Sequence, residues 1–252
     1  MKIQAFTDTG KVRDMNQDAF KTGFFKEGGA WAVVCDGMGG VSGGQVASEI
    51  CVNEVSSHIE KGYRKSMSMK SVKNLLVSAI TASNIKVFET ASEKQEYLGM
   101  GTTVVAVVIL NGFAVVAHVG DSRAYFINDE IKQITRDHSV VQYLIDIGRI
   151  TKEAAKTHPD RNVITRAVGV NMEVDVDVDI IPINQGETIL ICTDGLYEYI
   201  SDSQMFDIIK NSECEEPAKE LLQMANEAGG KDNITVVTVE GWFLWKIMLV
   251  KD

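Results

Sequence analysis

The chain has 252 residues, of which 25 are lysine or arginine and 35 are aspartate or glutamate, so its formal net charge is −10 at neutral pH. This length suits one large mixed domain, and 45% hydrophobic with 24% charged residues is ordinary for a globular protein. The acidic balance argues against nucleic acid and anionic membranes as partners, and it also repels phosphate groups unless cations lie between them and the protein.

The first predicted elements are short strands followed by two helices. The runs at 3–7, 19–25 and 30–35 are apolar or β-branched, as in strands. Apolar residues at helical spacing then predict one helix between residues 46 and 59 and another between residues 72 and 88. The chain therefore begins with a block of strands that is followed by a helical pair.

The middle of the chain is rich in strands. Predicted strands at 102–110 and 113–119 flank Asn111-Gly112, which is a strong hairpin signal, and strands at 124–127 and 131–134 form a second hairpin. The remaining predicted elements are a helix-prone segment at 139–171, strands at 174–180, 188–193 and 234–239, and helices at 204–210 and 217–229. This order lacks regular βαβ alternation, so it predicts an α+β fold with antiparallel sheets.

The cysteines, the N-terminal residues and the apolar segments indicate the cellular compartment. No two of the four cysteines form a C-x-x-C pair, which argues against a zinc knuckle or a thioredoxin-type site. The N-terminal residues open no signal peptide. The longest apolar stretch, 104–119, is interrupted by Asn111-Gly112 and is too short to span a bilayer. We therefore expect a cytoplasmic protein without a membrane anchor.

Aspartates stand at the ends of predicted strands, mostly beside glycine or asparagine. The set is Asp8, Asp18, Asp36, Asp121, Asp194 and Asp232. Any single Asp-Gly pair is best explained as a turn. The spacing of these residues in the sequence does not show that their side chains meet in the fold. Carboxylates gathered at a sheet rim, however, would need a cation to stay ionised at neutral pH. Oxygen ligands without His or Cys favour Mg²⁺ or Mn²⁺ over zinc.

The glycine-rich stretch 37–44 opens a helix but fits neither of two nucleotide-binding motifs. Gln45 stands where a P-loop needs lysine, and Ser42 replaces the third glycine of a dinucleotide fingerprint. Asp36 also places negative charge where phosphates would lie. These departures exclude both interpretations.

A series of motifs resembles, in order, those of the metal-dependent type 2C protein Ser/Thr phosphatases, particularly their compact bacterial members. The motifs are TDTGKVRDMNQD (7–18), VCDGMGG (34–40) with GGQVAS (43–48), GTT (101–103), VGDSRA (119–124), TRDHS (135–139), ITRAVG (164–169), CTDGL (192–196) and KDNIT (231–235). The resemblance covers residues 7–239. It implies a four-layer αββα sandwich, with two antiparallel β-sheets flanked by helices.

The resemblance also implies a metal centre. Asp36 would bridge two Mn²⁺ or Mg²⁺ ions, the Gly37 carbonyl would bind one of them, and Asp194 and Asp232 would complete the shell of the other. Asp18 would hold metal-bound waters. A third, weaker ion is expected at Asp121.

Further residues are assigned to the substrate by the same resemblance. Arg13 would grip the phosphate, because a guanidinium donates two parallel hydrogen bonds, and Asp8 and Asn233 would support the site. Two positions depart from the family pattern. Met38 stands where many eukaryotic members carry a histidine proton donor, and Gln17 stands where glutamate is frequent. Because methionine cannot donate a proton, the leaving group must be protonated by another group.

Residues 1–241 would form the catalytic domain, and the apolar tail at 242–252 is expected to pack on it. The alternative is that the tail is a docking site for a membrane or a partner protein. The segment of about 146–171 corresponds to the family's flap beside the active site. Its basic residues are Arg149, Lys152, Lys156, Arg161 and Arg166. They lie either on a solvated helix face or where they help to capture phosphopeptides.

The predicted function is hydrolysis of phosphoserine and phosphothreonine in proteins by a hydroxide that bridges two metal ions. The partners would be phosphorylated proteins and a bacterial-type Ser/Thr kinase whose action the enzyme reverses, with no nucleic acid or membrane involved. We expect a monomer. The alternatives are a catalytically silent regulator that binds phosphoproteins and a phosphatase of small phosphoesters.

Overall fold

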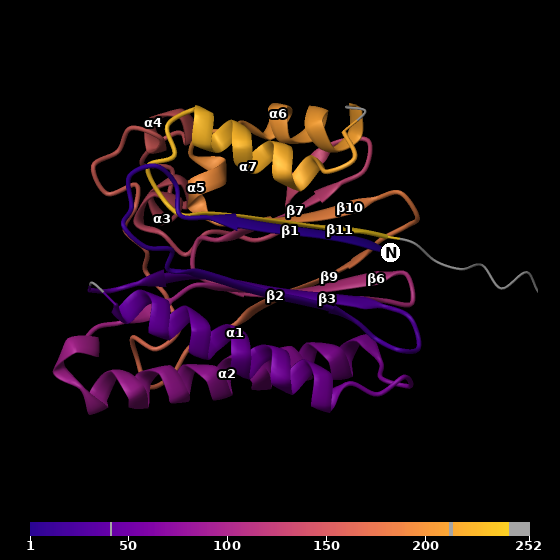
Figure 1. Cartoon of the computed structure of the whole chain (residues 1–252), viewed down its shortest axis with the longest axis horizontal. Coiled ribbons are helices and arrows are strands. Elements are labelled where there is room, and N and C mark those ends of the chain that lie inside the picture. Colours follow the sequence, from indigo (N-terminus) through magenta and orange to yellow (C-terminus); the bar gives the residue numbers. More distant parts are fainter. Residues whose placement is uncertain (41, 212–213, 242–252) are drawn as a thin grey trace, which may run out of the picture.

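The strands pair into two antiparallel sheets that lie face to face between two layers of helices (Figure 1). This arrangement is seen in a computed structural model that describes residues 1–40, 42–211 and 214–241. The expected four-layer αββα sandwich is therefore confirmed. The prediction that the tail at 242–252 packs on the domain concerns residues outside the described ones. Within the described residues, no helix has the length and apolar character needed to cross a membrane.

The first sheet contains both ends of the described chain. Its order is β1 (Lys2–Asp8), β11 (Ile234–Glu240), β10 (Thr188–Cys192), β7 (Arg123–Ile127) and β8 (Ile131–Gln133). The second sheet has the order β2 (Asp18–Phe24), β3 (Ala30–Met38), β5 (Val104–Leu110), β6 (Phe113–Val119) and β9 (Asp177–Pro182), and the short β4 (Gly101–Thr102) pairs with the end of β3.

Helices cover the outer face of each sheet. The second sheet packs against α1 (Gly43–Gly62) and α2 (Met69–Glu93), which the short 3₁₀ helix η1 (Gln95–Tyr97) follows. The first sheet is covered by α5 (Asp194–Tyr197), α6 (Asp202–Phe206), a π-helical turn at Asp207–Asn211 and α7 (Pro217–Glu227). The connection between the two sheets contains α3 (Val140–Asp146) and, within the expected flap segment, α4 (Lys152–Ala155).

The run of apolar residues in β5 is explained by burial on both faces. Val104, Ala106, Val108 and Leu110 point into the core between the second sheet and α1 and α2, whereas the alternate residues join the core between the two sheets. A strand covered on both sides needs no polar face. At the end of β5, Asn111 and Gly112 have φ angles of 52° and 80°, as expected for the tight hairpin that the sequence predicted.

Three predicted elements differ from the structure near the site. β3 continues past residue 35 to Met38, because β4 pairs with its last residues. The predicted strand at 102–110 is broken at Thr103, whose backbone N–H donates to the Asp36 carbonyl and whose hydroxyl accepts from the Asp36 N–H. α5 was not predicted, so Asp194 opens a helix instead of a turn.

Three further predictions differ in length or position. The helix-prone segment at 139–171 forms only the short α3 and α4, and α3 ends before Gly148, whose φ angle of 69° is left-handed. The strand predicted at 174–180 is β9, which begins at Asp177. The helix predicted at 204–210 is divided between α6 and the π-helical turn.

Candidate functional site

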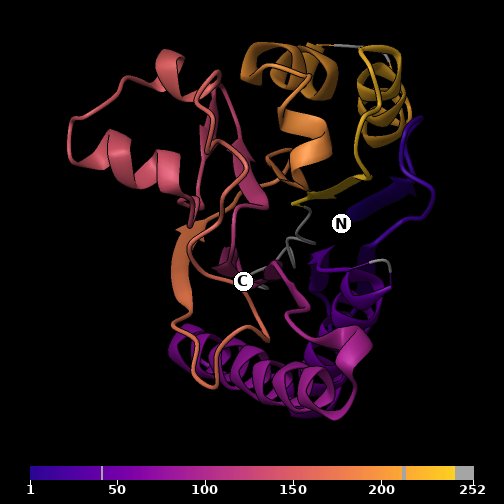
Figure 2. The same cartoon turned by 90° about the vertical axis from the view of Figure 1, so that its left-hand side faces the viewer.

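Loops of both sheets meet at one end of the sandwich, where β1, β3, β6 and β10 end and β2 and β11 begin. Figure 2 looks onto this end. Five of the predicted aspartates lie here, close enough for their charges to act on one another: Asp18, Asp36, Asp121, Asp194 and Asp232. We call these five side chains the carboxylate cluster.

Asp18 is held by two threonines. Its Oδ2 accepts hydrogen bonds from the hydroxyls of Thr235 at 2.6 Å and Thr193 at 2.9 Å. Its Oδ1 is buried and has no hydrogen-bond partner among the residues that the structure describes. Burial, partly offset by the two hydroxyls, raises the pKa of Asp18 to about 7. One carboxylate oxygen is thus fixed and the other is left free for a ligand.

Asp36 lies directly across from Asp18 in the β2–β3 ladder. Burial, followed by the charges of Asp18 and Asp194, raises the pKa of Asp36 well above its ordinary value. The next residue, Gly37, packs so closely that a Cβ there would collide with the Gly44 carbonyl. Only glycine therefore fits beside the start of α1 at this point.

Of the other three carboxylates, Asp194 opens α5, and Asp121 and Asp232 lie in loops. Burial, together with the charges of Asp121 and Asp232, raises the pKa of Asp194 well above its ordinary value. Burial likewise raises the pKa of Asp121 to about 6, with a further contribution from Asp137. Asp232 precedes β11 and accepts a hydrogen bond from the Arg13 guanidinium at 2.6 Å.

The carboxylate cluster fits a hard divalent cation. Its donors are oxygens without a histidine or cysteine among them, which favours Mg²⁺ or Mn²⁺. The buried, unpaired Asp18 Oδ1 supplies a lone pair that no protein group satisfies. The raised pKa values of Asp36 and Asp194 indicate that these buried, neighbouring carboxylates lack a cation to offset their negative charge.

Arg13, Asp8 and Asn233 belong to or contact the loop between β1 and β2. The Arg13 side chain is 54% exposed and lies beside Asp232. Asp8 Oδ1 accepts hydrogen bonds from the Gly10 N–H and from the Asn226 side chain, so Asp8 connects this loop to α7. Asn233 is buried and also bonds to the loop.

A second group of possible ligands, His118, His138 and Asp177, lies where β6 meets β9. The two imidazole rings are stacked with their planes 10° apart. Nearly parallel rings cannot both aim in-plane lone pairs at one ion. The Arg166 guanidinium lies 2.8 Å from Asp177 and 3.0 Å from His138 Nε2, where a cation would be repelled. This group is therefore structural.

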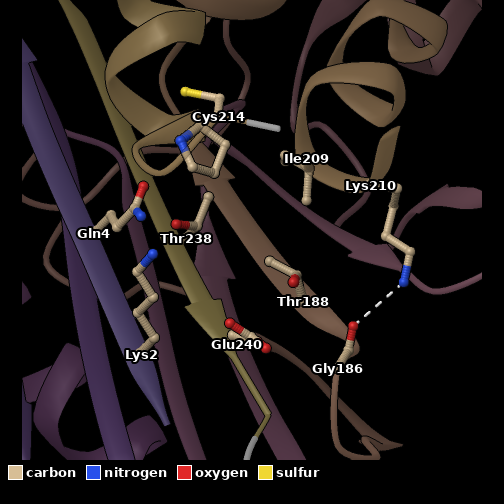
Figure 3. A pocket seen from close by; sticks show the side chains of 10 residues that line it. Lys2, Gln4, Gly186, Thr188, Ile209, Lys210, Cys214, Thr238 and Glu240 are labelled. Atoms are coloured by element: carbon tan, nitrogen blue, oxygen red, sulfur yellow. Dashed lines mark hydrogen bonds between the residues drawn. The ribbon is translucent and has the colours of Figure 1, made fainter. Parts of the chain in front are cut away.

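A cavity of about 270 Å³ lies at the opposite end of the first sheet, near the start of β1 and the end of β11 (Figure 3). Lys2 and Lys210 line it and donate to backbone carbonyls of residues 215 and 186. None of the clustered carboxylates lines this cavity. It is separate from the candidate site.

Sequence reasoning missed the side chains that orient the carboxylates. Thr193 and Thr235 hold Asp18, and Thr103 bonds to the Asp36 N–H and to Ser122. All three threonines are buried at 2% exposure or less. These threonines could have been found from the sequence, because each is a hydroxyl residue that lies within or beside an apolar strand and next to a motif of the site.

The geometry agrees with similarities to known proteins. Residues 10–235 match the family model described as protein phosphatase 2C. The serine/threonine phosphatase stp of Listeria innocua is 37% identical over 242 residues, which cover 95% of this chain and 96% of that protein.

Two crystal structures extend the similarity to the fold. The serine/threonine phosphatase Stp1 from Staphylococcus aureus has a TM-score of 0.88 and 37% identity, covering 96% of this chain and 95% of that chain. The Mycobacterium tuberculosis serine/threonine phosphatase PstP/Ppp has a TM-score of 0.84 and 32% identity, covering 95% of this chain and 97% of that chain.

Proposed function

This chain belongs to the protein phosphatase 2C family and is a protein serine/threonine phosphatase, and we propose that it hydrolyses its substrates at the carboxylate cluster with two Mn²⁺ or Mg²⁺ ions. The observation that carries this proposal is the convergence of five carboxylates around a buried, unpaired Asp18 Oδ1. The free guanidinium edge of Arg13 lies beside them. Such a site combines cation ligands with a phosphate-binding cation.

In this proposal Asp36 would hold both ions, and the Gly37 carbonyl would be a further ligand of one of them. Asp194 and Asp232 complete the shell of the other, and Asp18 orients water with its free Oδ1. Asp121 holds a third, weaker ion. When bound, a pair of such ions would lower the pKa of water and offset the negative charge of the phosphoryl group.

Arg13 binds the substrate phosphate in this proposal. Its side chain is exposed and lies next to Asp232, so its guanidinium can reach a phosphoryl group held over the carboxylate cluster. Two parallel N–H donors match two phosphoryl oxygens, which a lysine ammonium cannot do. Arg13 therefore orients the phosphate for attack from the side of the cluster.

The substrates are phosphorylated proteins, and a bacterial-type Ser/Thr kinase is the partner whose phosphorylation the enzyme reverses. We assign the enzyme to the cytoplasm as a monomer. The acidic net charge supports a preference for protein substrates over nucleic acid.

The decisive test is phosphate release from a phosphothreonine peptide in the presence of Mn²⁺. Asp194→Asn keeps the side-chain shape but removes one ligand charge, so we expect a loss of activity on the order of 10²-fold or more. Asp179→Asn on the exposed edge of β9 is the matched control and should keep wild-type activity.

The alternatives give different results in the same assay. A silent phosphoprotein-binding regulator would bind the peptide and release no phosphate. A phosphatase of small phosphoesters would turn over phosphorylated metabolites faster than the peptide. Metal-dependent release that persists in Asp194→Asn would contradict the proposed site.

A further inference from the structure

A buried amide side chain connects the start of β11 to the loop at 9–17, which carries Arg13. Asn233 Nδ2 donates to the Thr9 carbonyl at 2.9 Å and to the Met15 carbonyl at 3.0 Å. Its Oδ1 accepts the Gln17 N–H at 2.8 Å. One side chain thus holds both ends of this loop, which we call the Arg13 loop.

The hydrogen-bonding groups of Asn233 match this position. Two carbonyls and one N–H face the buried Asn233 side chain, and an amide offers the two donors and the acceptor that they need. Aspartate would keep the acceptor and lose both donors. Alanine would leave all three backbone groups without this partner. Because the side chain is only 6% exposed, water cannot easily replace it.

The rest of the Arg13 loop has few attachments. The Lys11 N–H donates to the Gly230 carbonyl, and the Asn16 side chain donates to the Thr7 hydroxyl. Among the described residues, the bond from Asn233 to Met15 is the one hydrogen bond that ties the backbone of residues 12–16 to another part of the fold. The position of Arg13 therefore depends on the bond from Asn233 to Met15, together with the ion pair between Arg13 and Asp232.

We propose that Asn233 is a positioning residue for substrate binding, which fixes the Arg13 loop so that the Arg13 guanidinium faces the substrate phosphate. The proposal rests on the proposed function and assigns Asn233 a role through Arg13, rather than through its neighbour Asp232. Loss of the amide should therefore weaken phosphate binding and leave metal binding unchanged.

The test is a double-mutant cycle between Asn233 and Arg13, measured as KM for a phosphothreonine peptide and as inhibition by inorganic phosphate. With Arg13 present, Asn233→Ala should raise both constants about tenfold, within the range of coupling between residues that act as one unit. In an Arg13→Ala background, Asn233→Ala should change them less than twofold. The Mn²⁺ affinity of the metal-free protein, measured by calorimetry, should stay within twofold.

Two further variants separate positioning from general stability. Asn84→Ala is the matched control, because the buried Asn84 side chain makes the same three bonds to another loop: it accepts from the Gly169 N–H and donates to the carbonyls of Asn171 and Met172. Its effect on KM should be the same with and without Arg13. Asn233→Asp keeps the side-chain shape and should raise KM as Asn233→Ala does.

Two results would overturn the inference. One is equal losses from Asn233→Ala in both Arg13 backgrounds, which would make the two side chains independent. The other is a fall in Mn²⁺ affinity that matches the fall in activity, which would place the effect at Asp232. Either result from an active wild-type enzyme leaves the proposed function intact, whereas an inactive wild-type enzyme contradicts the proposed function itself.

Discussion

Arg123 is bound on several sides of its guanidinium group. Its Nε and Nη2 donate to the Asp137 carboxylate at 2.7–3.1 Å, and its Nη1 donates to the Tyr125 hydroxyl at 3.0 Å. The guanidinium carbon lies 3.6 Å from the centre of the Tyr197 ring. Arg123, whose side chain is 23% exposed, stands two residues after Asp121, so its ion pair with the buried Asp137 helps to fix the loop that carries Asp121.

We predict that Arg123→Met lowers the free energy of unfolding by about 3–5 kcal/mol, because it leaves the Asp137 charge buried without its cation. The Asp137 side chain is 7% exposed and would keep only the Gln133 amide as a partner. Urea denaturation of the metal-free protein measures the change.

The matched control for this prediction is Arg161→Met on the flap. The Arg161 side chain is 48% exposed and lies 3.9 Å from Glu198, so its loss should change stability by less than about 1 kcal/mol. Equal losses in the two variants would show that the buried pair has no special weight.

At the scale of elements, the flap carries its positive charges in two different ways. Arg166 is paired with Asp177 and contacts His138 at the base of the flap, so its charge serves the fold. Arg149, Lys152, Lys156 and Arg161 are exposed. The flap stands at the same end of the sandwich as the carboxylate cluster (Figure 2). We therefore propose that the exposed charges help to capture phosphopeptides.

We predict that Lys156→Glu combined with Arg161→Glu raises KM for a phosphopeptide several-fold, because a cationic approach to the site is replaced by an anionic one. kcat should change little, because neither side chain contacts the carboxylate cluster. Steady-state kinetics at low ionic strength, where such charges are least screened, measure the effect.

The control reverses Lys65 and Lys70, which are exposed near the turn between α1 and α2, at the other end of the molecule. The control variant changes the net charge by the same amount as the flap variant. An equal rise in KM in both variants would therefore show that the effect comes from overall charge and not from the flap. An unchanged KM in the flap variant would leave its basic residues as a solvated face.

At the scale of the whole molecule, the like charges of the carboxylate cluster make the stability of the folded protein depend on pH. Burial raises the pKa of Asp18 to about 7 and that of Asp121 to about 6, and it also raises the pKa values of Asp36 and Asp194 well above the ordinary value. The ordinary carboxyl pKa is about 4. Folded metal-free protein therefore binds more protons than the unfolded chain between about pH 4 and 7, and its stability falls as pH rises through that range.

We predict that the metal-free protein melts about 5 °C or more lower at pH 8 than at pH 5, and that Mn²⁺ restores much of this difference at pH 8. Asp194→Asn removes one of the repelling charges. It should raise the melting temperature of the metal-free protein at pH 8 and reduce the stabilisation by Mn²⁺. Scanning calorimetry across the pH range measures both effects; identical curves for the two proteins would contradict this account.

Local patterns along the chain determine much of the fold. The hairpin at Asn111-Gly112, the helical pair and the helix from Pro217 depend on residue spacing within one segment, and the structure confirms them. Their physics is local, because φ preferences and amphipathic periods are properties of neighbouring residues. The order of the motifs likewise indicates the family, which the similarities to known phosphatases confirm.

The sequence by itself thus determined most of the elements, the fold class and the aspartates that could bind a cation, although it missed α5 and predicted too much helix at 139–171. Only the tertiary structure decided which groups meet. Asn233 bonds to Gln17 and Thr9, from which it is separated by 216 and 224 positions in the sequence. Asp18 bonds to Thr193 and Thr235, from which it is separated by 175 and 217 positions. Such contacts depend on how the two sheets stack and in which register their strands pair. A pattern within one segment carries no information about residues so far away in the sequence.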